Sequence, residues 1–159
     1  GVARRPWRWF AWRPRNLGYL SSLIQFIGTI LFNINTGDAL LPDLTTTEKN
    51  LAIWTPNLAG SACFLVSSLL GYLEVAHRIG AFNFRDLTMW IASCNNLGSI
   101  AFQIAAVASF TLATDETWWT GGANGGVLIG GLLFLVGSYL LIPELFEKTP
   151  ARHDQLAPA

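Results

Sequence analysis

Residues 125–146, GGVLIGGLLFLVGSYLLIPELF, form an apolar run whose one charged residue is Glu144. A helix of roughly twenty such residues is long enough to cross about 30 Å of hydrocarbon. Three further runs of similar length and character precede it, at residues 17–34, 55–75 and 88–112. The sequence therefore predicts four transmembrane helices.

The composition of the 159 residues supports a membrane protein. Charged residues make up 13% and apolar residues 52%, and ten basic residues balance ten acidic ones. These values exclude a disordered chain, a basic nucleic-acid-binding domain and a disulfide-rich secreted module. A soluble protein with four such helices would have almost no polar helix faces to show to water.

Positive charges predict how the helices are oriented. Nine of the ten Lys and Arg residues lie in the segments before residue 17, between residues 76 and 87, and after residue 146. The positive-inside rule then places both termini and the middle loop in the cytoplasm, and the loops at residues 38–49 and 115–119 outside. We expect a bacterial inner (plasma) membrane protein without a cleavable signal peptide. Gly1 is not an initiator methionine, so we expect residues before it.

The chain then divides into five segments. Residues 1–16 form a basic, Trp-rich interfacial segment, and residues 17–75 form a first transmembrane hairpin. Residues 76–87 form a cytoplasmic linker, residues 88–146 a second hairpin, and residues 147–159 a polar tail.

The two hairpins resemble each other at a spacing of 70 residues. GTILF at 28–32 aligns with GSIAF at 98–102, and GSACFLVSS at 60–68 aligns with GGLLFLVGS at 130–138. A unit of two spans keeps its orientation when it is duplicated. We therefore predict an all-α membrane protein of two tandem helical hairpins, related by a parallel pseudo-two-fold axis along the membrane normal.

Each span contains a glycine followed four residues later by a phenylalanine, and both residues lie on one helix face. Estimated depths bring each glycine level with the phenylalanine of the other helix in its hairpin. In lipid, helices associate by close packing at small residues. The sequence thus predicts contacts of Phe side chains with Gly notches, made by Gly28, Phe32, Gly60, Phe64, Gly98, Phe102, Gly130 and Phe134.

Two-span units with this G-(small)-x-x-F motif in both helices resemble the YrhK-like domain, a small bacterial membrane domain. The resemblance covers about residues 17–144 as two tandem units. It implies the hairpin architecture, and it implies no activity and no catalytic residues.

The N-terminal segment combines tryptophans with arginines between Pro6 and Pro14. Trp favours the headgroup region, and Arg pairs with anionic lipids. We expect this segment to anchor the first helix to the membrane, with docking to a partner protein as the alternative. Its contact residues would be Arg4, Arg5, Trp7, Arg8, Trp9, Trp12, Arg13 and Arg15.

Glu74 and Glu144 occupy equivalent positions in the repeat, at the C-terminal ends of the second and fourth spans. A carboxylate is unfavourable at that end of a helix, so each acid requires a partner. Arg78, Arg85 and the N-terminal arginines lie on the same side and would form salt bridges with them. A contact with a partner protein and a role in proton handling remain alternatives.

Residues suited to metal, cofactor or catalytic chemistry are sparse. His77 and His153 lie outside the spans, and Cys63 and Cys94 differ in predicted depth by more than a disulfide permits. The sequence has no phosphate-binding loop, nucleophile elbow or zinc-protease motif. We therefore expect no metal, no cofactor and no enzymatic activity.

Amide side chains at Gln25, Asn95, Asn96 and Gln103 lie within the spans. We expect them to form hydrogen bonds between helices, with a polar path or a lipid headgroup contact as the alternative.

These features favour a non-catalytic accessory or structural subunit of a larger membrane complex, for example a lipid-handling transport assembly. Its partners would be other integral membrane proteins and anionic lipids, with no nucleic acid and no evident soluble substrate. The alternatives are a small homo-oligomeric transporter or channel, which needs a wet polar path, and a lipid-modifying enzyme, for which no catalytic set is present.

Overall fold

The computed structural model describes residues 14–76 and 85–147, apart from the side chains of two residues near the end. In these ranges the regular structure is helical, and four helices are long and apolar enough to cross a membrane, which confirms the prediction of an all-helical fold with four apolar spans. The elements are α1 (Leu17–Asp38), α2 (Thr46–Glu48), the π-helix η1 (Lys49–Trp54), α3 (Thr55–Ala76), α4 (Leu87–Ala108) and α5 (Thr120–Glu147).

Side-chain caps fix the starts of α1 and α4. Asn16 Oδ1 accepts a hydrogen bond from the backbone N–H of Tyr19 at 2.8 Å. Asp86 Oδ1 accepts one from the backbone N–H of Thr88 at 3.0 Å. Each cap satisfies an N–H group that has no partner within its helix. Both α1 and α4 thus begin directly after an Asn or Asp, at positions 70 residues apart.

The second membrane helix begins nine residues before the expected Thr55, because a capping box starts it. Thr45 Oγ1 accepts from Glu48 N, and the Glu48 carboxylate accepts from Thr45 N at 2.9 Å. Pro56 follows with no N–H to donate. Just before it the chain adopts the π-helical geometry of η1, and Asn50 O accepts from both the N–H and the hydroxyl of Thr55.

The third membrane helix ends four residues before the expected Leu112. Beyond Ala108 the chain turns back on itself, and Trp118 N donates to Phe110 O at 2.8 Å. Trp119 N donates to Ala108 O at 3.0 Å. α5 then begins at Thr120, five residues earlier than expected.

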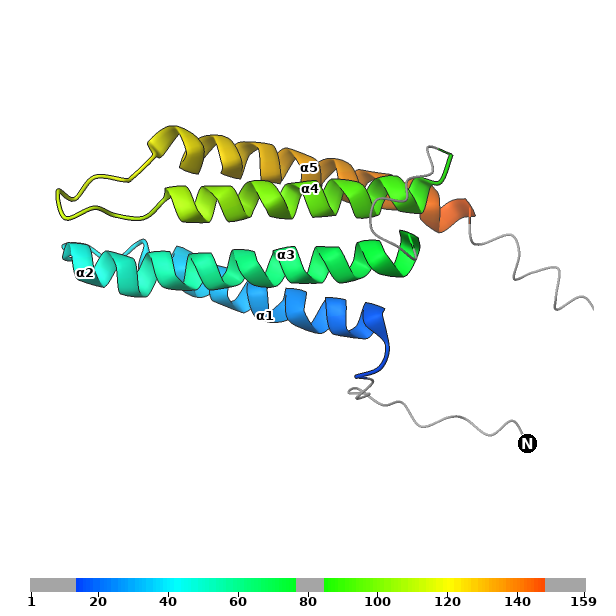
Figure 1. Ribbon diagram of the computed structural model, residues 1–159, viewed down its shortest axis with the longest axis horizontal. Coiled ribbons are helices and arrows are strands. Elements are labelled where there is room, and N and C mark those ends of the chain that lie inside the picture. Colours follow the sequence, from blue (N-terminus) through cyan, green and yellow to red (C-terminus); the bar gives the residue numbers. More distant parts are fainter. Residues whose placement is uncertain (1–13, 77–84, 148–159) are drawn as a thin grey trace, which may run out of the picture.

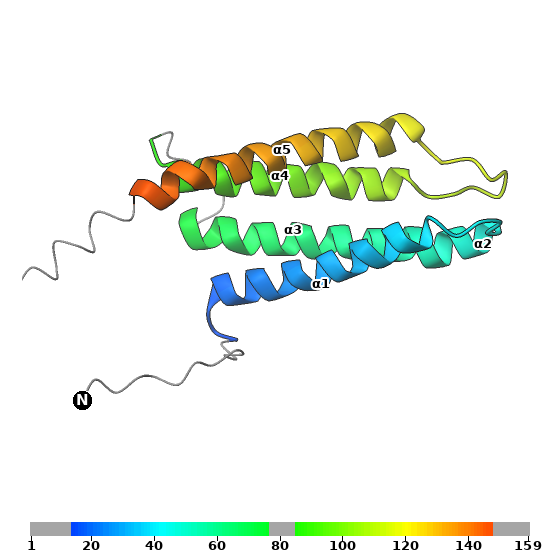
Figure 2. The ribbon, with the colours of Figure 1, turned by 180° about the vertical axis from the view of Figure 1, so that it is seen from behind.

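α1 packs against α3, α4 packs against α5, and α3 packs against α4 (Figures 1 and 2). The beginnings of α1 and α4 and the ends of α3 and α5 lie together at what we call the terminal end. The connections at residues 39–45 and 109–119 lie at the opposite loop end.

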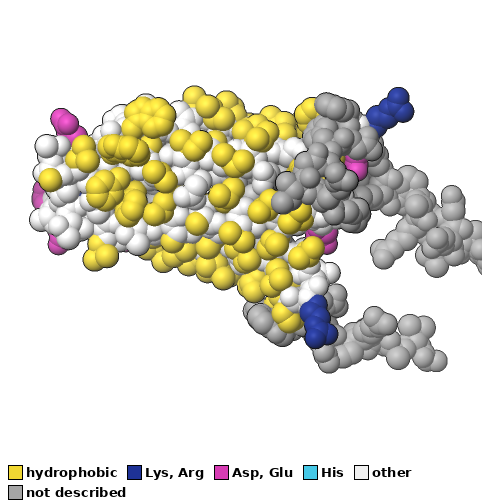
Figure 3. All heavy atoms as spheres, in the orientation of Figure 1, with side chains coloured by type: hydrophobic (Ala, Val, Ile, Leu, Met, Phe, Trp, Pro, Cys, Tyr) yellow, Lys and Arg dark blue, Asp and Glu magenta, His cyan; other side chains and the backbone are white. Residues whose placement is uncertain are grey.

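Small side chains fill the interior of this bundle. Ser61, Ser67, Ser99 and Ala106 are at most 1% exposed. Large apolar side chains instead cover the flanks, and acidic side chains lie at the two ends of the bundle (Figure 3). This distribution is the one expected in lipid, where tight helix contacts use small residues and the solvent around the helices is apolar.

Candidate functional site

The four phenylalanines of the repeated motif meet in one cluster, to which each membrane helix contributes one ring. The ring centroids of Phe32 and Phe64 are 5.9 Å apart, and those of Phe102 and Phe134 are 5.6 Å apart. Phe32 also lies 5.9 Å from Phe102, and Phe64 lies 6.4 Å from Phe134. We call these four residues the Phe cluster. Contacts at this spacing join α1 to α4 and α3 to α5, and also α1 to α3 and α4 to α5.

The motif glycines bring the helix backbones close together. A Cβ atom at Gly98 would lie 3.2 Å from both Gly130 O and the Phe134 ring. A Cβ atom at Gly130 would lie 2.8 Å from the Phe102 ring. These distances leave no room for a larger residue at either position without movement of the neighbouring helix.

The arrangement between α1 and α3 is related but different. A Cβ atom at Gly28 would lie 3.1 Å from the Phe64 ring and 3.0 Å from Gly60 O. At Gly60 the nearest neighbours are Gly28 O at 3.1 Å, the Leu31 side chain and the backbone nitrogen of Phe32. The Gly60 notch therefore receives mainly backbone, where the sequence argument expected the Phe32 ring.

A cavity of about 220 Å³, lined by both polar and apolar side chains, lies between the Phe cluster and the terminal end, and we call it the terminal-end cavity. All four membrane helices line it. Its polar lining consists of Ser21 and Gln25 from α1, Ser67, Ser68 and Tyr72 from α3, Thr88 and Asn95 from α4, and Glu144 from α5.

Hydrogen bonds between α1 and α3 form one wall of this cavity. The fully buried Ser67 hydroxyl lies 2.8 Å from Ser21 O and 3.0 Å from Gln25 Oε1, and it donates to these oxygens. Ser21 Oγ donates to Ser67 O at 2.9 Å. On the opposite wall, Asn95 Oδ1 faces Gly137, at 3.0 Å from the position of a Cβ atom there. Amide groups from two helices thus border the same space.

The amides within the spans otherwise behave as expected. Gln25 accepts from Ser67 across α1 and α3, and Gln103 Oε1 accepts from Ser61 Oγ at 3.1 Å across α4 and α3. Asn96 Nδ2 donates to Ser68 Oγ at 3.4 Å. For these three amides the prediction of hydrogen bonds between helices is confirmed.

Glu74 and Glu144 each lie against the first turn of the antiparallel neighbouring helix. Thr88 Oγ1 donates to Glu144 Oε1 at 2.7 Å. The Glu74 carboxylate covers Gly18, with Oε2 2.7 Å from where a Cβ atom would be. A helix N-terminus attracts negative charge, so this position offsets the unfavourable end of the acid's own helix.

The charge pattern of the sequence predicts arginine partners for these acids. Arg85 lies at the terminal end beside the N-cap of α4, and Arg15 is exposed beside the N-cap of α1. The other predicted contact residues lie outside the described residues: Arg4, Arg5, Trp7, Arg8, Trp9, Trp12, Arg13 and Arg78.

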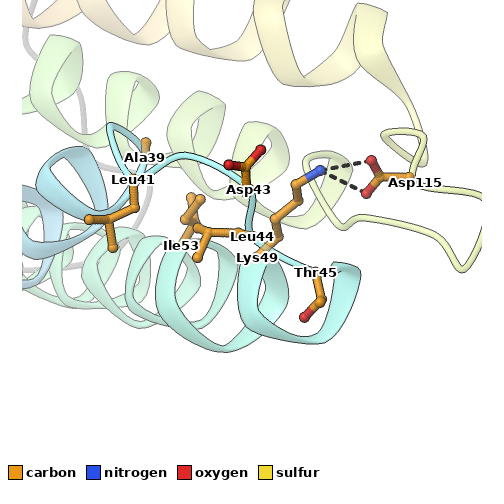
Figure 4. Close-up of a pocket in the computed structure, with 8 residues that line it drawn as sticks. All are labelled: Ala39, Leu41, Asp43, Leu44, Thr45, Lys49, Ile53 and Asp115. Atoms are coloured by element: carbon orange, nitrogen blue, oxygen red, sulfur yellow. Dashed lines mark hydrogen bonds and ion pairs between the residues drawn. The ribbon is translucent and has the colours of Figure 1, made fainter.

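A second cavity of about 540 Å³ lies at the loop end (Figure 4). Lys49 Nζ binds both Asp115 carboxylate oxygens at 2.8 Å, and Asp43 and Thr45 line the same space. The hydrogen bond from Lys49 lowers the pKa of Asp115, and its positive charge acts in the same direction.

Further polar contacts at the loop end join η1 to α4 and to the connection that follows α4. Asn50 donates to Thr111 O at 2.7 Å and accepts from Thr111 N at 3.0 Å. Trp54 Nε1 donates to Ala106 O at 2.9 Å, and its ring packs edge-on against Phe110. The loop end is thus a set of matched polar contacts, whereas the terminal-end cavity retains unmatched groups.

A polar stripe on the outer face of α1 was missed by the sequence argument. Ser22, Thr29, Asn33 and Thr36 are all exposed, and their spacing of seven, four and three residues places them on one helix face. Each donates to the carbonyl four residues earlier in α1, at 2.8 to 3.0 Å. The spacing alone would have revealed this α1 stripe.

The described part of the chain has few residues suited to metal binding or redox chemistry. Residues 14–76 and 85–147 contain no group of three or more His, Cys, Asp or Glu suited to a metal ion. Cys63 and Cys94 are both free thiols.

No protein-family model, curated protein or solved structure matches the chain. The resemblance to the YrhK-like domain therefore stays a prediction.

Proposed function

We propose that the protein is a non-catalytic accessory subunit that packs, through the outer face of α1, against a transmembrane helix of another membrane protein. The α1 stripe is the observation that carries this proposal. A cytoplasmic terminal end, a bacterial inner membrane and an origin by duplication of a hairpin belong to the same proposal.

Among α1, α3 and α4, α1 has the fewest residues buried inside the protein. Its one buried residue is Gly28, whereas α4 buries nine residues. A helix with so few buried residues has a large surface free for a partner. The exposed polar residues from Ser22 to Thr36 extend along about 21 Å of that surface.

The α1 stripe is poorly suited to contact with lipid tails alone. Its hydroxyls are satisfied only by their own helix, and the Asn33 side-chain oxygen has no partner among the described residues. Lipid tails offer no hydrogen bonds, so unmatched polar groups on a span favour association with another helix. Ser, Thr and Asn also allow close approach and hydrogen bonding between helices.

The proposal extends to lipids. The arginines and tryptophans in the first sixteen residues suit anionic headgroups, so a lipid-handling transport assembly is the complex that we favour.

Purification in mild detergent, with quantitative mass spectrometry of the co-purified proteins, tests the proposal. The variant Thr29→Leu with Asn33→Leu removes the centre of the stripe. Ile27→Leu with Ile34→Leu is the matched control, because both isoleucines are exposed on another face of α1. Circular dichroism and thermal melts establish that both variants are folded.

We expect other membrane proteins to co-purify in stoichiometric amounts with the wild type and with the isoleucine control. With the stripe variant, the amount of co-purified protein should fall at least five-fold. Recovery of the wild type alone, or an undiminished complex with the stripe variant, would refute this role for α1.

The terminal-end cavity supports a second candidate, the homo-oligomeric transporter or channel. Its lining supplies the polar surface that such a function needs. Blue native electrophoresis separates the two candidates, because a transporter or channel would form a complex of this chain alone.

A further inference from the structure

The terminal-end cavity contains amide groups whose hydrogen-bonding capacity is unused. Gln25 accepts from Ser67, but its Nε2 group donates to no described residue. The half-buried Asn95 side chain makes no hydrogen bond in the described structure. Both amides line one cavity, so a single polar occupant is able to satisfy both.

The size and lining of the cavity indicate which occupant that is. A cavity of about 220 Å³ has room for several water molecules. Hydroxyl and amide groups donate and accept hydrogen bonds, as water does, whereas lipid tails do neither. Thr88 and Glu144 lie near the ends of their helices, and the cavity extends from them to Gln25 and Asn95 in the span interiors.

The Phe cluster lies directly beyond the deepest polar groups. Phe64 is one helical turn from Ser67, and Phe102 is two turns from Asn95. Its rings make mutual contacts at 5.6 to 6.4 Å. Beyond it, the Ser61–Gln103 hydrogen bond marks the loop-end half of the bundle. Four aromatic rings therefore separate two polar regions.

We propose that the terminal-end cavity is an aqueous vestibule that admits water and small polar solutes from the terminal end, and that the Phe cluster closes it. This inference concerns the interior of the bundle and does not depend on the accessory role of α1.

Cysteine accessibility in sealed proteoliposomes tests the proposal. The background is the full chain with Cys63→Ala and Cys94→Ala, and the probe is a membrane-impermeant methanethiosulfonate with a trimethylammonium group. Such reagents react with thiolate, which forms in water and not among lipid tails. Mass spectrometry of the intact protein follows the reaction rate, and Arg15→Cys identifies vesicles in which the terminal end faces the reagent.

Asn95→Cys and Ala92→Cys place thiols in the vestibule at two lining positions, so the test survives if one variant fails to fold. Leu97→Cys is the matched control, because Leu97 lies on the same helix at a similar depth and is 54% exposed on the outer surface. Gln103→Cys probes the region beyond the Phe cluster.

We expect Asn95→Cys and Ala92→Cys to react at least ten-fold faster than Leu97→Cys from the terminal end, and Gln103→Cys to stay unmodified from that side. If the thiols of Asn95→Cys and Ala92→Cys react no faster than the thiol of Leu97→Cys, the cavity contains no water and the proposal is overturned. Rapid modification of Gln103→Cys from the terminal end would overturn closure by the Phe cluster.

Discussion

Gly126 is the position at which the packing of α5 against α4 is most easily tested. A Cβ atom there would lie 2.6 Å from Ala101 O, 2.8 Å from Ala105 Cβ and 3.0 Å from Ala105 N. Two of these three neighbours are backbone atoms, which are unable to rotate away. Substitution by alanine therefore requires the two helices to separate.

The structure gives the size of the effect. The Cβ atom would be about 0.8 Å closer to Ala101 O than ordinary van der Waals contact permits. Overpacking of this kind typically costs about 1–3 kcal/mol. The replacement of a helical glycine by alanine offsets up to about 1 kcal/mol of that cost. We expect Gly126→Ala to lower the free energy of unfolding by about 1–2 kcal/mol.

Gly131 provides the matched control on the same helix, because a Cβ atom there would meet nothing within 4 Å. We expect Gly131→Ala to leave the free energy of unfolding unchanged or to raise it by up to about 1 kcal/mol. Reversible unfolding in mixed micelles with increasing dodecyl sulfate, followed by circular dichroism, measures both variants. The reasoning is refuted if the two variants unfold within about 0.5 kcal/mol of each other.

Three further predictions concern polar contacts. Ser67→Ala removes the buried hydroxyl between α1 and α3 and should cost about 0.5–2 kcal/mol in the same unfolding assay; Ser22→Ala, on the exposed face, is the control and should cost less. Trp54→Phe keeps an aromatic ring against Phe110 but loses the donor to Ala106 O, so a cost of about 1 kcal/mol is expected, and an unchanged midpoint would contradict it. The pKa of Asp115 is lowered in the folded state, so its contribution is present above its ordinary pKa and is lost as pH falls through the lower, folded-state value. Proteolysis of the loop end should therefore accelerate in acid for the wild type, and Asp115→Asn should proteolyse faster at neutral pH and lose that part of the pH dependence.

Short-range patterns in the sequence predict the helices but place their ends less well. The four apolar runs predicted the four spans, because only a helix in lipid satisfies the backbone of so long an apolar segment. The early start at Thr46 depends on the T-x-x-E capping box. This motif is recognisable in the sequence, but the sequence analysis did not predict a helix start there. The early end at Ala108 depends on hydrogen bonds from Trp118 and Trp119, which no local pattern predicts.

The same division applies to the candidate site. The spacing of glycine and phenylalanine identified the residues of the Phe cluster and the motif glycines. It did not show that four rings from four helices meet, nor that Gly60 faces backbone. Nor did the charge pattern show that an antiparallel neighbour places a helix N-terminus beside Glu74 and beside Glu144.

By itself, the sequence determined that the chain is helical and suited to a membrane, and which small and aromatic residues recur in each half. Only the tertiary structure decided which faces meet, and so where the terminal-end cavity lies and that the α1 stripe is exposed. The physical reason is that spans such as α5 are apolar on every side, so hydrophobicity does not select a face. Close contacts between small residues set the rotation of each helix instead, and these contacts exist only once the helices are packed.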